Sequence, residues 1–212
     1  MKTIRTLLLC LTIMVATLLS GCYLKSVHPL VTDSDLVLIE GLDGRYESED
    51  QRWTFINDPA KIPDLNIADM TFDGEEEEET PNYYIVLFEN LQDISSDTTY
   101  FIGKIGSFNN HYFLDMFLFD LSGSSNFMDA HKFPVHTFSR IRLDGNDLSI
   151  QFFEDSWLED QIDNNRIRIK HESTEDGILV TASTKELQRF VNKYADEEDA
   201  FDDAMILTRK ES

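Results

Sequence analysis

Basic residues are scarce in this 212-residue sequence. Lysine and arginine together number 18, against 40 aspartate and glutamate residues, which gives a formal net charge of −22 at pH 7. This shortage argues against nucleic acid as a partner, because phosphates require a basic surface. It also argues against a broad electrostatic attachment to anionic lipid. The charge favours solubility and cationic partners, and an acidic proteome in a salt-adapted or cold marine organism would explain it equally well.

Short catalytic motifs are also missing. The sequence contains no H-E-x-x-H, G-x-S-x-G, P-loop or dinucleotide-binding fingerprint, and no closely spaced His–Asp–Ser order. We therefore predict no cofactor and no metal site, and we favour a non-enzymatic role. The histidines that could still carry chemistry are His28, His111, His131, His136 and His171.

His136 is the best placed of these histidines, because FPVHTFSRIRL has the pattern of a strand. It could contact a ligand inside a barrel or titrate near neutral pH. A hydrogen bond to a neighbouring loop is the simpler alternative, and we favour it. His131 lies five residues upstream, so a two-histidine metal pair is conceivable, but no carboxylate partner can be identified for it.

Cysteine is nearly absent, and both cysteines lie near the N-terminus. Cys10 falls within an apolar run over 7–19, which Lys2 and Arg5 precede, and Cys22 follows it closely. The run of about 13 residues is too short to cross a bilayer comfortably, which takes about 20. A basic start, an apolar run and small residues before a cleavage point together predict a secretory signal peptide.

The end of this segment, Leu19-Ser20-Gly21-Cys22, resembles the lipobox of bacterial lipoproteins. In that family the cysteine is diacylated, the bond before it is cut and the new amino group is acylated. The resemblance implies lipid attachment at Cys22, and two or more acyl chains anchor a protein stably. A plain cleaved signal or a buried N-terminal helix is the alternative. Tyr23, rather than aspartate, follows the cysteine, which by analogy implies the outer membrane and a periplasmic domain.

Cleavage before Cys22 would remove two basic residues and no acidic one. The remaining chain would carry 16 basic and 40 acidic residues, so its net charge would be −24. With Cys22 acylated no thiol would remain, which excludes a disulfide, thiol catalysis and a cysteine metal site. We expect a signal peptide over 1–21, a lipidated tether over 22–35 and a single β-rich domain over 36–212.

Strands dominate the expected domain. Short runs rich in β-branched and aromatic residues alternate with turn residues, as in FNNH at 108–111, DGND at 144–147 and EDGI at 175–178. This pattern predicts an antiparallel barrel or sandwich. The expected strands cover 44–48, 52–57, 83–89, 99–105, 111–117, 135–143, 147–153, 166–171, 177–181 and 204–209.

Two helices interrupt the strands. Ser156 with Glu159, and Ser183 with Glu186, have the spacing of a capping box, which predicts helices over 156–165 and 183–195. In the second helix Leu187, Phe190, Val191 and Tyr194 recur at helical spacing. We expect this apolar face to pack on the sheet.

Basic residues at two-residue spacing share one face of a predicted strand. Arg140 and Arg142 form one such pair, and Arg166, Arg168 and Lys170 repeat the pattern. In so acidic a chain they can pair with carboxylates across strands, which we favour. The alternative is that they line a cavity for an anionic ligand, with His136, Arg140 and Arg142 as the ligand-facing candidates.

Two acidic runs stand out, at 74–80 and at 195–204. Runs of like charge usually form solvated loops. Calcium needs six to eight oxygens in a spaced pattern, and neither run has the D-x-D-x-D-G spacing. We therefore interpret both runs as solvated loops.

Two further resemblances are present, and the first of them covers most of the mature chain. VHPLVTDSDLV, GLDGRYE, PVHTFSRIRL and VTASTKELQRFV resemble a recurrent set of bacterial lipoproteins, a likeness that implies no mechanism. GLDGRYES with RWTF, and ILTR near the C-terminus, are similar to the opening and closing strands of lipocalin-like barrels. That likeness implies that Arg209 packs across Tyr46 in a structural role, although Tyr46 stands where tryptophan is usual.

These observations favour a lipid-anchored envelope lipoprotein. Its domain is expected to be a non-catalytic binding or interaction module for a small or lipidic ligand, or for an envelope protein. The alternative is an envelope hydrolase whose catalytic residues lie apart in the sequence. A filled barrel would favour protein interaction, whereas a buried His–carboxylate pair facing a cleft would favour the enzyme.

Overall fold

The computed structural model describes residues 23–58, 82–92, 98–119, 135–175 and 177–211. Cys22 with the rest of the lipobox, the acidic run at 74–80 and His131 lie outside the described residues. The acidic run at 195–204 lies within them.

The domain is built on a closed barrel of eight antiparallel strands. The ring runs in the order β6-β5-β4-β3-β2-β11-β8-β7, and pairing of β6 with β7 closes it. This confirms the predicted mainly β architecture with two helices. The barrel strands are β2 (Gly44–Glu47), β3 (Gln51–Ile56), β4 (Tyr84–Asn90), β5 (Thr99–Phe108), β6 (His111–Phe119), β7 (His136–Asp144), β8 (Asp147–Phe152) and β11 (Met205–Lys210).

Two of the predicted tight turns join neighbouring barrel strands. Asn109 and Asn110 between β5 and β6 have φ of 48° and 63°, and Gly145 between β7 and β8 has φ of 60°. Asparagine and glycine tolerate this left-handed backbone better than other residues, so the turns occur where the sequence provides them.

Large apolar side chains fill the barrel. Residues at alternate positions of each strand point inward, as Leu148, Ile150 and Phe152 do on β8. Tyr46, Phe55 and Ile105 are fully buried among them. The other buried members of this interior cluster are Leu42, Trp53, Tyr84, Val86, Leu114, Met116, Ile141 and Leu207.

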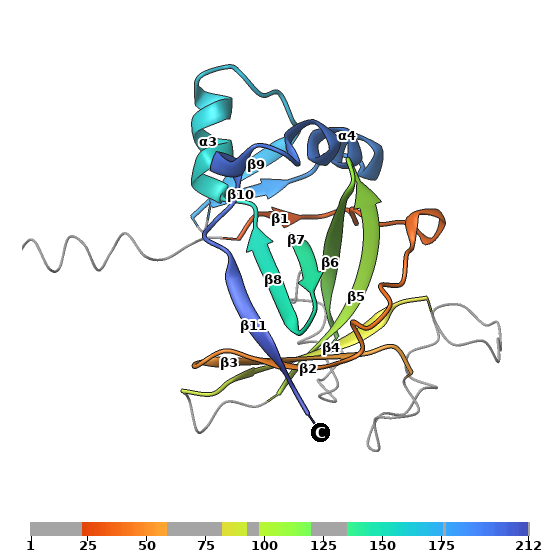
Figure 1. Ribbon diagram of the computed structural model, residues 1–212. Helices are drawn as coiled ribbons and strands as arrows, with labels where there is room; N and C mark the ends of the chain where they lie inside the picture. Colours follow the sequence, from red (N-terminus) through yellow and green to blue (C-terminus); the bar gives the residue numbers. More distant parts are fainter. Residues whose placement is uncertain (1–22, 59–81, 93–97, 120–134, 176, 212) are drawn as a thin grey trace, which may run out of the picture.

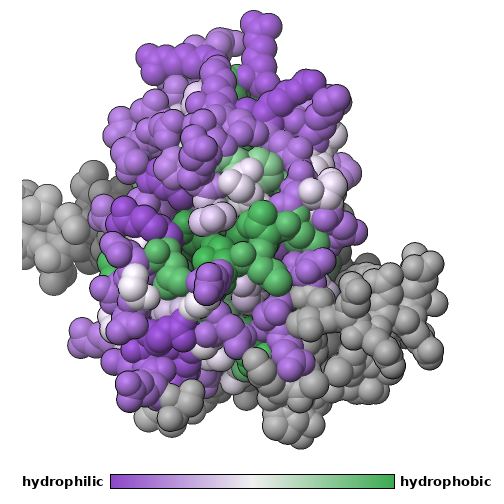
Figure 2. Space-filling model, turned by 45° about the vertical axis from the view of Figure 1, so that its right-hand side comes forward, coloured by the Kyte–Doolittle hydropathy of each residue, from purple (hydrophilic) through white to green (hydrophobic). Residues whose placement is uncertain are grey.

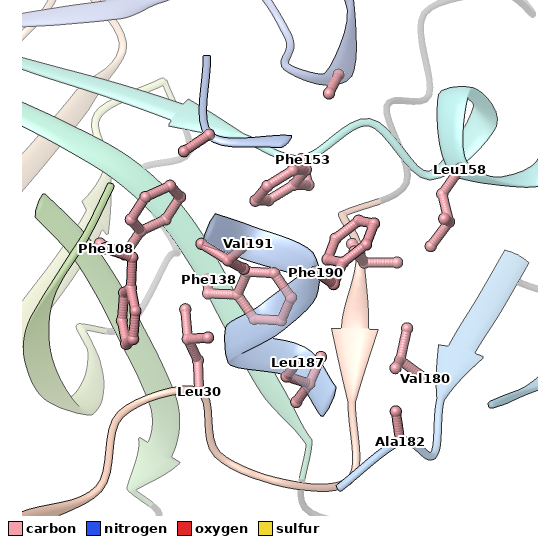
Figure 3. Packing of buried hydrophobic residues seen from close by; sticks show 14 of the residues in the cluster. Leu30, Phe108, Phe138, Phe153, Leu158, Val180, Ala182, Leu187, Phe190 and Val191 are labelled. Carbon is pink, nitrogen blue, oxygen red and sulfur yellow. The ribbon is translucent and has the colours of Figure 1, made fainter. Parts of the chain in front are cut away.

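A cap covers one end of the barrel, at the top of Figure 1. Its core is a second hydrophobic cluster, in which Leu187, Phe190 and Val191 of one cap helix pack beside Phe138 and Phe153 (Figure 3). The cap elements are β1 (Lys25–Ser26), the 3-10 turn η1 (Asp33–Asp35), α3 (Asp155–Asp163), β9 (His171–Thr174), β10 (Gly177–Val180), α4 (Thr184–Tyr194) and the 3-10 turn η4 (Glu198–Ala200).

The segment 23–35, expected to be a tether, is instead part of the fold. Leu24, Leu30 and Val31 are buried in the cap core. Ser26 of β1 pairs with His136 of β7 on one side and with Val180 of β10 on the other. The sequence of this segment has no strand or helix pattern, but these three apolar residues pack in the cap core. Residues in the segment 23–35 are therefore part of the domain.

The two helices differ in how well their starts were predicted. At α4, Ser183 is the N-cap, and its N–H donates to the Glu186 carboxylate at 3.0 Å, as the capping box requires. Helix α3 begins one residue earlier than predicted, with Glu154 as its N-cap, so Ser156 is not the cap. The Ser156 hydroxyl donates to the Glu154 carboxylate instead, at 2.7 Å.

The strand predicted over 166–171 is wrong. Residues 167–170 carry no ladder pairing, and β9 begins at His171 and pairs with β10. Ile167 and Ile169 alternate with basic residues as in a strand, but they pack against the cap core from an extended connection. The alternation therefore reflects one buried side, not a sheet.

Candidate functional site

Asp115 is a buried carboxylate on the outer wall of the barrel. Leu114 and Met116 of β6 point into the barrel, so Asp115 between them points outward, toward the segment that leads into η1. The side chain is only 2% exposed. Its Oδ2 accepts hydrogen bonds from the Leu30 N–H at 2.7 Å and from the Val31 N–H at 3.1 Å. Asp115 thus fastens the N-terminal segment to the barrel wall.

His136 is the second partner of this carboxylate. Its Nδ1 lies 2.8 Å from Asp115 Oδ1, and its ring lies 5.0 Å from that of Phe117, the residue opposite it in the ladder. A carboxylate that already accepts two backbone N–H groups can only accept here, so Nδ1 carries the proton. In the neutral ring Nε2 is then the nitrogen that can accept a hydrogen bond.

A half-open groove of about 610 Å³ lies beside this pair, between the outer barrel wall and the segment 29–36. Its size is that of a small-molecule site, and such sites are mostly apolar with a few polar groups. Apolar surface also forms a band across the middle of one face of the molecule (Figure 2). The groove is lined by Pro29, Val31, Thr32, Asp33, Leu36, Tyr83, Ile102, Lys104, Asp115, Phe117 and His136.

Polar contacts hold one edge of the groove in place. Lys104 Nζ on β5 lies 2.6 Å from the Asp33 carboxylate of η1. Burial disfavours ionisation of Asp35, but hydrogen bonds from Thr32 and Gln188 outweigh it and lower the pKa of that carboxyl. On the other side of the groove, burial raises the pKa of the Tyr83 hydroxyl. The edge formed by η1 is therefore tied both to the barrel and to α4.

No protein-family profile matches this chain, and neither a curated protein nor a solved structure gives a significant match. The function must therefore be argued from the site itself.

The three ligand-facing candidates do not share one site. His136 lines the groove, but on the outer wall rather than inside the barrel. Arg140 is buried under the cap, where its guanidinium donates to Ala195 O at 2.8 Å and lies 3.0 Å from the exposed Glu198 carboxylate. Arg142 is exposed. The arginines face outward because Ile141 between them occupies the interior of the barrel.

Arg209 lies across Tyr46, the pairing that the lipocalin likeness implies. The Arg209 guanidinium carbon is 4.8 Å from the centre of the Tyr46 ring. Its nitrogens also donate to the Tyr46 hydroxyl and to the Gly41 and Asp43 carbonyls. Gly44 leaves the space for this arginine, because a Cβ there would collide with the guanidinium. The contact closes the barrel end and belongs to the fold.

Asp115 is the site residue that sequence reasoning missed. In HYFLDMF it is a lone charge on a strand face that otherwise carries Phe113 and Phe117. An acidic residue among outward aromatics indicates that something covers that face, which is a signal the sequence contains. Its partners, 84 and 85 residues earlier in the chain, could not be identified from spacing.

Within the described part of the chain, no cluster of three or more His, Cys, Asp or Glu side chains is arranged to hold a metal ion. Over the same residues, no helix combines the length and the apolar character needed to cross a membrane.

Proposed function

We propose that this protein is a lipid-anchored envelope lipoprotein whose domain binds a small or lipidic ligand without catalysis. The observation that carries the proposal is the groove on the outer wall of the barrel, which is open and mostly apolar. The barrel interior is filled, which by itself would favour protein interaction, but the groove outside it supplies the space for a small or lipidic ligand. The Asp115–His136 pair would supply polar specificity at one point of that surface. A lipocalin-like ligand cavity inside the barrel is not needed.

Anchoring rests on the lipobox resemblance. The acyl chains at Cys22 would hold the protein in the outer membrane, with the domain in the periplasm. A hydrophobic ligand or an envelope protein suits that location, and the acidic charge opposes nucleic acid.

Replacing Cys22 with serine is expected to abolish lipid attachment, because the thiolate is the group that takes the lipid. Metabolic labelling with a radioactive fatty acid should mark the wild-type chain and not the Cys22→Ser chain, which should also leave the membrane fraction. A Cys22→Ser chain that is still labelled would refute the lipobox interpretation.

Binding in the groove can be tested on the purified protein. Native mass spectrometry should reveal a co-purified mass that disappears on denaturation, and the uncharged probe N-phenyl-1-naphthylamine should compete for the same space. Phe117→Ala removes a half-buried lining ring, so probe affinity should fall about tenfold. Leu118→Ala, at the exposed neighbour outside the groove, should leave it unchanged. Equal affinities for the two variants would refute binding in the groove.

A hydrolase is the second candidate, and the Asp115–His136 pair facing the groove is the observation that favours it. A carboxylate that orients a histidine is the base-and-orienter half of a nucleophilic site. Thr32, one of the hydroxyl residues on the groove wall, bonds to Ser34 and Asp35 instead of to His136. Turnover of a p-nitrophenyl acyl ester that is lost in His136→Gln would establish the enzyme.

A further inference from the structure

A cluster of cations lies on the cap, away from the groove. It consists of Arg166, Arg168, Lys170, Arg189 and Lys193, which we call the basic patch. All five are exposed. They line two adjoining cavities of about 360 and 320 Å³ between the connection 166–170 and helix α4. Arg189 and Lys193 are one helical turn apart, so they lie on the same face of α4.

The basic patch makes no close ion pair among the described residues, although Lys170 and Arg189 act electrostatically on Glu186. None of its five side chains lies within ion-pair distance of an acidic group there, although Arg45, Arg52, Lys104 and Arg140 all do. Lys193 lies instead over a tyrosine ring, 4.7 Å from its centre. Among the described residues, the pairing favoured from the sequence for Arg166, Arg168 and Lys170 is therefore not found, which favours the alternative that they line a cavity for an anionic ligand.

Glu186 is the carboxylate that lines both cavities, and it is already engaged. It accepts hydrogen bonds from the Ser183 side chain at 2.8 Å and from the Ser183 N–H at 3.0 Å. These bonds lower the pKa of Glu186 and hold it at the start of α4. The five basic side chains of the patch thus lie beside one carboxylate, that of Glu186, which is already hydrogen-bonded to Ser183. They do so in a chain whose net charge is −22.

Such a cluster suits phosphate groups. Arginine guanidinium groups bind phosphate through paired N–H donors, and lysine adds a mobile point charge. The acidic remainder of the chain would repel an anionic surface, so attraction would be confined to this patch and would orient the molecule. A local basic patch is therefore compatible with the lack of a broad electrostatic attachment to anionic lipid.

The position of the patch identifies the source of the phosphate. Tyr23, which directly follows Cys22, already bridges to Glu154 at the start of α3, and its ring lies 4.5 Å from that of Phe152. The described chain thus begins in the half of the molecule that carries α3, α4 and β9 (Figure 1). The Thr184 and Gln188 side chains of α4 donate to Pro29 O and Leu30 O. With no tether after Cys22, an acyl anchor would hold this half close to the bilayer.

We propose that the basic patch binds the negatively charged phospholipid headgroups of the bilayer that holds the Cys22 acyl chains. This inference rests on the anchoring part of the proposed function. Headgroup contacts would add a second attachment to the acyl chains and would fix how the domain sits on the membrane, because each cation near an anionic surface contributes measurably.

Hydrogen exchange of the full lipoprotein in vesicles tests the proposal. Amides of 166–171 and α4 should exchange about tenfold more slowly in phosphatidylglycerol-containing vesicles than in pure phosphatidylcholine. About 0.5 M salt should remove the difference, because it screens surface charge. The double variant Arg168→Gln/Arg189→Gln should lose most of the protection. Arg142→Gln/Lys210→Gln, which changes the charge equally at exposed positions outside the patch, should retain it.

Three results would overturn the proposal: equal exchange in the two kinds of vesicle, equal protection in the two double variants, or full protection by inorganic phosphate in neutral detergent. The last result would assign the patch to a free phosphate ligand. Flotation of the vesicles separates this test from that of anchoring. A protein that does not float with its vesicles refutes the acyl anchor, whereas a protein that floats without protection refutes the patch alone.

Discussion

Replacing Asp115 with alanine is expected to lower the free energy of unfolding by about 3–5 kcal/mol, because it removes a buried carboxylate that holds three hydrogen-bonding partners. Two backbone N–H groups, at Leu30 and Val31, would lose their acceptor in a buried setting, and His136 would lose its partner. Urea unfolding would measure the change. The damage should be concentrated where the bonds were, so amide exchange over 24–31 should accelerate more than exchange in β5 and β6.

Asp144→Ala is the matched control, because Asp144 is exposed at the end of β7. Surface substitutions of this kind change stability by less than about 0.5 kcal/mol. A similar small effect for Asp115→Ala would mean that the N-terminal segment is held to the barrel by its apolar residues alone. Amide exchange that accelerates uniformly would show that segment and barrel unfold as one unit.

The second large effect is expected at Phe153, the centre of the cap core. This side chain is 1% exposed, and its ring lies 4.3 Å from that of Phe201, 5.4 Å from that of Phe190 and 5.7 Å from that of Phe138. Phe153→Ala would leave a cavity bounded by these three rings, which come from β7, from α4 and from the residue after η4. We expect a loss of about 3–5 kcal/mol in urea unfolding.

Phe153→Leu keeps most of the volume and should cost less than about 1.5 kcal/mol. Ile206→Ala, at a side chain 51% exposed on β11, should be nearly neutral. If Phe153→Ala were no worse than Phe153→Leu, the cap would be able to close around the cavity. The cap core would then be more deformable than its close ring contacts indicate.

The barrel could be predicted from the sequence because its signals are local. Alternating residues define each strand, and Asn109, Asn110 and Gly145 mark two turns. The cap could not be predicted in the same way. Its strand β1 is two residues long, and the segment around it is ordered by contacts far along the chain, at Asp115, Val180 and Gln188. The strand wrongly predicted over 166–171 has the same cause. Its alternation of apolar and basic residues arises because Ile167 and Ile169 pack against the cap core, which is built from residues far away in the sequence.

The candidate site could likewise be predicted only where its signals are local in the sequence. His136 was identified because a histidine on a strand is conspicuous, but its face of the sheet depends on the phase of the alternation over the whole of β7. Arg140 and Arg142 were correctly placed on one face, yet the cap covers the first and leaves the second in solvent. Which outward residues are covered is decided by tertiary packing, so no periodicity could separate them.

The closed ring and the two-residue β1 determine how the molecule would respond to mechanical force. Tension applied at Tyr23 would act first on β1, which forms only two residue pairs with β7 and two with β10. It would then act on the hydrogen bonds of the N-terminal segment to Asp115. Because β1 is not one of the ring's eight strands, its detachment would leave the pairings of the ring intact. Tension at the opposite terminus would act on β11, which is paired with β2 and β8, and would open the ring itself. The domain is thus mechanically weak at its N-terminal attachment and strong at its C-terminal end.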